Sequence, residues 1–117
     1  MDAKEFSVFR SLLADVHAKA FGEPISKLPH GKAQTLSWLV QEATGEVLSY
    51  KSLGNYVCAA IDNKAERVNP TVSTLAILAK FLGDSEPTVW RRPAICVADW
   101  ATWFRYRSKV LAYEEAA

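Results

Sequence analysis

Hydrogen-bonding side chains surround one leucine, Leu53, in residues 49–55. On a helix that turns Leu53 toward the core, Lys51 and Asn55 lie on the outward side, and Gly54 leaves room for close approach of another molecule. An asparagine amide pairs bidentately with adenine, a lysine donates to guanine or phosphate, and hydroxyl groups bond to phosphate. We therefore predict that this segment contacts double-stranded DNA. The candidate residues are Ser49, Tyr50, Lys51, Ser52 and Asn55.

A second group of candidates is basic and lies near the end of the chain. Between positions 91 and 109, five basic residues accompany a single acidic one, Asp99. Because duplex binding depends on contacts of lysine and arginine with phosphates, this segment is a candidate phosphate-binding flank. The alternative is a solvated helix edge, since cations are also favoured near a helix C-terminus. The candidate residues are Arg91, Arg92, Arg105 and Lys109.

Aromatic residues are concentrated in the same region, at Trp100, Trp103 and Phe104. They have three alternative roles: filling the core, forming a self-association surface, or stacking on single-stranded bases. Core packing is favoured, because aromatic residues at helical spacing normally fill an interior. The three residues nevertheless span a wide arc of a helix. We therefore predict that part of this arc contacts a protein partner or a second copy of the chain.

Catalytic and metal-binding patterns are missing from the sequence. There is no Ser-His-Asp order, no glycine-rich phosphate loop, and no pair of cysteines at zinc-ligand spacing, since Cys58 and Cys96 stand far apart. A lone histidine such as His17 or His30 is more often structural or solvent-facing than catalytic. We therefore expect a protein that is not an enzyme and that holds neither a cofactor nor a metal.

The composition indicates a globular chain. The 117 residues are 50% hydrophobic and carry a formal net charge of +1, which predicts one domain with its own core and supports no electrostatic argument for the molecule as a whole. The longest apolar runs, such as residues 56–61, are far shorter than the roughly 20 residues that cross a bilayer. The N-terminus has no export signal. We expect a cytoplasmic protein without a membrane partner.

Apolar residues recur at steps of three and four along most of the chain, and no alternating strand pattern competes. The periodicity predicts a single all-α domain of five helices over residues 1–117. Gly22, Gly45 and Gly83 follow three of the periodic segments, as glycine commonly does after a helix. The predicted helices cover residues 3–21, a segment after Gly31 that ends at Thr44, residues 49–61, residues 71–82, and a last helix from Ala94 or Ala98 to Tyr113.

The order of elements from residue 35 to residue 83 is that of a helix-turn-helix unit. Residues 48–53 (LSYKSL), Asn69-Pro70-Thr71 and residues 74–83 (TLAILAKFLG) resemble the lambda-repressor/Cro-like helix-turn-helix family, over about 49 of the 117 residues. The resemblance implies a helix-turn-helix core at about 33–83, followed by an aromatic and basic C-terminal helix at about 94–113. It implies that Ser49 caps the recognition helix and that Leu53 anchors it. It also implies sequence-specific binding of duplex DNA, transcription regulation, and dimer formation.

Three features depart from the family's pattern. Leu36 stands where the family often has a glutamine that contacts phosphate, and the turn at residues 44–48 is longer than the usual tight turn. Glu42 and Glu46 also place negative charge near the predicted DNA-contacting helix. The alternative to DNA binding is a helical protein-interaction module that uses the tryptophan-rich C-terminal helix.

Overall fold

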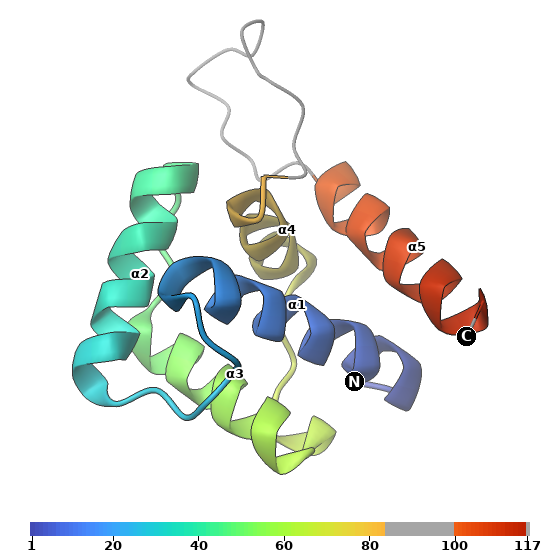
Figure 1. Ribbon diagram of the computed structural model, residues 1–117, viewed down its shortest axis with the longest axis horizontal. Coiled ribbons are helices and arrows are strands. Elements are labelled where there is room, and N and C mark those ends of the chain that lie inside the picture. Colours follow the sequence, from blue (N-terminus) through green and yellow to red (C-terminus); the bar gives the residue numbers. More distant parts are fainter. Residues whose placement is uncertain (84–99, 117) are drawn as a thin grey trace, which may run out of the picture.

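The computed structural model describes residues 1–83 and 100–116, which form five α-helices and one short 3-10 turn (Figure 1). No strand occurs within these residues, so the predicted all-α class is confirmed. Helix α5 begins at Trp100; the earlier start predicted at Ala94 or Ala98 falls outside the described residues. The elements are α1 (Ala3–Phe21), α2 (His30–Thr44), α3 (Tyr50–Asp62), the 3-10 turn η1 (Ala65–Arg67), α4 (Val72–Phe81) and α5 (Trp100–Ala116).

Helix α1 forms because its apolar residues fall on one face and both of its ends are capped. The carboxylate of Asp2 accepts from the backbone N–H of Glu5 at 2.8 Å, and Gly22 ends the helix in the left-handed conformation at φ 69°. The buried face packs against α3, α4 and α5 (Figure 1). This face consists of Phe6, Val8, Phe9, Leu12, Leu13 and Val16.

Helix α4 is the most completely buried element. Its residues from Leu75 to Ala79 are all buried, and it packs against α1, α2 and α5. A helix that is apolar around most of its circumference is stable only when neighbours cover it, which explains its central place (Figure 1). The hydroxyl of Thr71 caps its start by accepting from the N–H of Thr74 at 3.2 Å.

Polar contacts and buried aromatic rings fix α5 against α1 and α4. Trp103 is 2% exposed and Tyr106 is 5% exposed. The Tyr106 hydroxyl donates to Asp15 Oδ2 at 2.8 Å and lies 3.0 Å from the hydroxyl of Ser11. Arg107 Nε donates to Glu5 Oε1 at 2.6 Å. These contacts join the first helix of the chain to the last one.

His17 has a structural position, as predicted for a lone histidine. It is fully buried, with Nδ1 at 3.1 Å from the backbone oxygen of Glu23 and its ring 5.0 Å from the ring of Phe21. The ring therefore ties the segment after α1 to the end of that helix. None of the helices in residues 1–83 and 100–116 combines the length and apolar character needed to cross a membrane.

Candidate nucleic-acid interface

Helix α3 turns the side that carries Lys51 and Asn55 toward solvent. Leu53 and Val57 are buried at 0% and 1% exposure, which fixes the rotation of the helix about its axis. Lys51 and Asn55 are exposed, and Tyr50 and Ser52 are half-buried. Lys51 carries the one charge of this helix before Asp62 at its end. The predicted donors of residues 49–55 therefore lie together at the N-terminal half of α3.

Gly54 lies beside the solvent-facing side of α3 that carries Lys51 and Asn55. A Cβ atom built at Gly54 meets no other atom within 4 Å, apart from the helix's own backbone and the adjacent residues. Glycine within a helix costs about 0.5–1 kcal/mol relative to alanine. The packing of the described residues gives no reason for this cost. The surface of α3 is consequently open to close approach at this point.

Helix α2 and the following turn position the start of α3. Ser37 Oγ donates to the backbone oxygen of Leu48 at 2.5 Å, and the rings of His30 and Tyr50 meet edge-to-face at 4.9 Å. The end of α2 is fixed as well, because Lys80 Nζ donates to the backbone oxygen of Thr44 at 3.2 Å. The turn between the two helices is held at both of its ends.

Ser49 occupies the N-cap position of α3, but its hydroxyl makes no capping hydrogen bond. The prediction that it accepts from an amide of the first turn is therefore wrong. Its backbone oxygen accepts from the N–H of Leu53 at 3.0 Å, so the residue begins the helix through its main chain alone. Ser49 is exposed, as is Lys51 two residues later.

An ionic cluster at the other end of α3 was not predicted. Asp62 pairs with Arg67 at 3.1 Å and with Lys27 at 3.6 Å, and Cys58 Sγ donates to it at 3.5 Å. Partial desolvation raises the pKa of Asp62, but the hydrogen bonds from Cys58 and Arg67 and the charge of Lys27 outweigh it and hold the pKa below its usual range. Arg67 and Asn55 border a shared hollow of about 260 Å³. Arg67 lies outside α3, so the helical periodicity of the sequence could not predict that it borders the same hollow as Asn55.

The predicted basic flank does not adjoin α3. Arg105 and Lys109 are exposed on α5, which packs against α4 and α1, whereas α3 packs against α2 and α1 (Figure 1). The two basic residues therefore lie on a different part of the molecule from Lys51. The predicted flank residues Arg91 and Arg92 lie outside the described residues.

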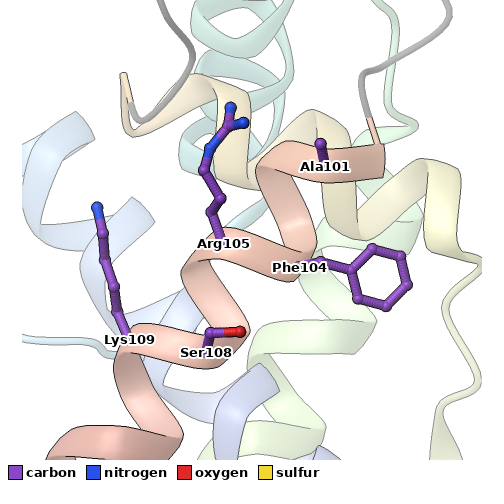
Figure 2. Close-up of a pocket in the computed structure, with 5 residues that line it drawn as sticks. All are labelled: Ala101, Phe104, Arg105, Ser108 and Lys109. Carbon is purple, nitrogen blue, oxygen red and sulfur yellow. The ribbon is translucent and has the colours of Figure 1, made fainter.

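The aromatic residues of α5 divide between core and surface. Trp103 packs in the core, so the prediction that it contacts a partner is wrong: the docking of α5 on α4 and α1 covers its ring. Phe104 is 50% exposed, as predicted for part of the arc. The side chain of Trp100 lies outside the described part of the chain. Figure 2 shows Phe104 on one side of a shallow hollow of α5 and the long side chains of Arg105 and Lys109 on the other.

Comparisons with protein-family models, with curated proteins and with solved structures found no match to this chain. Within residues 1–83 and 100–116, no group of three histidine, cysteine or acidic side chains is arranged to hold a metal ion. The functional interpretation therefore depends on the geometry of α3 and its neighbours.

Proposed function

We propose that this protein binds double-stranded DNA in a sequence-dependent manner through α3 and acts in transcription regulation. The observation that carries the proposal is the rotation of α3, which buries Leu53 and Val57 and leaves Lys51 and Asn55 in solvent. A major groove about 12 Å wide admits one helix whose N-terminal residues reach base edges. Asn55 would then pair with adenine, and Lys51 would donate to guanine or phosphate.

Two further features support the same orientation. Gly54 leaves open space beside Asn55, so the backbone of α3 can approach the wall of a groove closely. Ser49 at the N-cap of α3 is exposed, like Lys51, and helix N-termini favour phosphate through their N–H groups and dipole. The first feature allows close approach of α3, and the second places polar donors at the end of α3 that would enter the groove.

The test is selection of bound sequences from a random duplex library at about 50 mM salt, followed by titration of the selected duplex. We expect the double variant Lys51→Ala/Asn55→Ala to bind at least about tenfold more weakly, and loss of the Lys51 phosphate contact to reduce the salt slope by about one. Lys4→Ala is the matched control, because Lys4 is exposed on α1 and its loss changes the net charge equally. Equal weakening by Lys4→Ala, or no enriched sequence, would contradict the proposal.

A second candidate function is a helical protein-interaction module that uses α5. The exposure of Phe104, which is 50%, at the edge of a hollow on α5 favours this function, because such a hollow can receive a side chain of a partner. The two functions differ in the residues they need. A module of this kind depends on Phe104 and is insensitive to changes at Lys51 and Asn55.

A further inference from the structure

A hollow of about 430 Å³ lies where α1, the connection of residues 22–29 and the last turn of α3 meet. Helix α1 packs against α3 (Figure 1), and the pairing of Lys27 with Asp62 at 3.6 Å holds the connection at the end of α3. Hollows of this size receive small molecules. We call it the Arg10 hollow; its lining residues are Arg10, Ser11, Ala14, Ile25, Ala60 and Ile61.

Arg10 brings one positive charge to this hollow. Its Nε donates to the backbone oxygen of Ala60 at 3.0 Å, which fixes one edge of the guanidinium group. A guanidinium group has five N–H donors, and the four on the two Nη atoms have neither a hydrogen-bond partner nor an ion pair in the part of the chain that the structure describes. No acidic residue stands three or four positions away on α1, and Asp62 is paired with Lys27 and Arg67. Carboxylates of the described residues therefore do not neutralise Arg10.

The remaining described residues of the Arg10 hollow carry no charge, and most of them are apolar. Ile61, at the end of α3, is 36% exposed, and Ile25 of the connection is half-buried. The hydroxyl of Ser11 is occupied, because it lies 3.0 Å from the hydroxyl of Tyr106. The hollow therefore presents one unneutralised guanidinium group beside an apolar wall.

We propose that the Arg10 hollow binds a small monocarboxylate with an apolar body, such as an aryl carboxylate or a branched-chain carboxylate. The planar fork of a guanidinium group matches the two oxygens of a carboxylate. The side chains of Ile25 and Ile61 lose contact with water when the body of the ligand covers them, which favours binding. A single lining cation balances a single negative charge, so a carboxylate is a better occupant than a phosphate dianion.

A free small molecule fits the hollow better than the carboxyl terminus of a peptide. Arg10, Ser11 and Ala14 lie within α1, whose backbone groups are bonded inside the helix. These residues offer an extended peptide no row of main-chain donors and acceptors. The hollow is lined by neither Lys51 nor Asn55, so this inference does not depend on the proposed DNA binding.

An amide NMR titration of the full chain with phenylacetate as the probe tests the proposal. We expect the largest amide shifts at the residues that line the hollow, with a Kd of about 1 mM, as for other ligands of this size. Phenylacetamide keeps the ring without the charge, and acetate keeps the charge without the ring, so each should bind at least about tenfold more weakly. N-acetylphenylalanine imitates the end of a peptide and should bind no more tightly than phenylacetate.

Substitutions at the hollow identify the groups that bind the probe. Arg10→Met keeps an unbranched apolar stem and removes the charge, so phenylacetate should bind at least about tenfold more weakly. The matched control is Lys4→Met, at an exposed position of α1 outside the hollow, which should bind like the parent. Ile61→Ala, which keeps the bond from Arg10 to Ala60, should weaken binding at least about threefold through loss of apolar contact. Circular dichroism verifies that each variant is folded.

Any of four results would overturn the proposal. The first is a parent whose amide shifts at about 10 mM phenylacetate do not gather around the hollow. The second is equal binding of phenylacetate by the parent and by a folded Arg10→Met variant. The third is a Kd for phenylacetamide or acetate that equals the Kd for phenylacetate, since the site would then recognise only an apolar body or only an anion. The fourth is tighter binding of N-acetylphenylalanine, which would indicate a peptide terminus as the occupant.

Discussion

Replacement of Gly54 by alanine should make the protein more stable and its DNA binding weaker. The added Cβ meets no atom within 4 Å outside the adjacent backbone, so it introduces no clash in the free protein. Alanine is favoured over glycine inside a helix by about 0.5–1 kcal/mol, and the free energy of unfolding should rise by that amount. Urea denaturation measures this change directly.

The same methyl group would meet the wall of a groove that α3 enters. Forcing one extra carbon into a well-packed contact costs about 1–3 kcal/mol, which corresponds to roughly 5- to 150-fold weaker binding of the selected duplex. Tyr113→Ala is the control, because it also raises helix propensity at an exposed position but lies on α5. A Gly54→Ala protein that is more stable and binds DNA with unchanged affinity would refute the close approach of α3. A less stable protein would refute the open surroundings of Gly54.

Three other changes test the structure itself. Leu53→Ala should lower the free energy of unfolding by about 2–5 kcal/mol in urea, because Leu53 is fully buried; a neutral result would mean that α3 is rotated. Tyr106→Phe should cost about 0.5–1.5 kcal/mol by removing the hydrogen bonds to Ser11 and Asp15, and an unchanged urea midpoint would contradict them. The folded-state pKa of Asp62 lies below its usual value, so its stabilising effect is present above the unfolded pKa of about 3.9 and is lost as the pH falls through the folded value. Asp62→Asn should therefore reduce the loss of stability between about pH 4 and pH 2 in acid titrations followed by circular dichroism, and an unaltered acid transition would count against the cluster.

Local sequence determines much of α1 to α4. Periodic apolar residues predicted which face each helix buries, and Leu53 and Val57 on α3 are buried as expected. Glycines at positive φ, such as Gly22 and Gly45, end helices where the pattern predicted. These features depend on contacts within a few residues of one another, and for that reason a single sequence is sufficient to identify them.

The errors concern contacts between distant parts of the chain. Whether Trp103 or Phe104 is buried depends on how α5 docks on α4 and α1, and helical spacing allows either. The place of Arg105 relative to α3 is likewise a consequence of that docking. Ser49 shows a different limit: the residue type favours a cap, but the hydrogen bond also requires a side-chain orientation that the sequence does not specify.

The hydroxyl of Tyr106 joins residues that are 91 positions apart when it donates to Asp15. Closing so long a loop costs chain entropy before this hydrogen bond is gained, so the contact of α5 with α1 is expected to form after α1 to α4 have packed. Interactions that form late in folding act mainly on the rate of unfolding. Detachment of the last helix is then the first step by which the protein opens, and amide hydrogens of that helix should exchange with solvent sooner than those of α4.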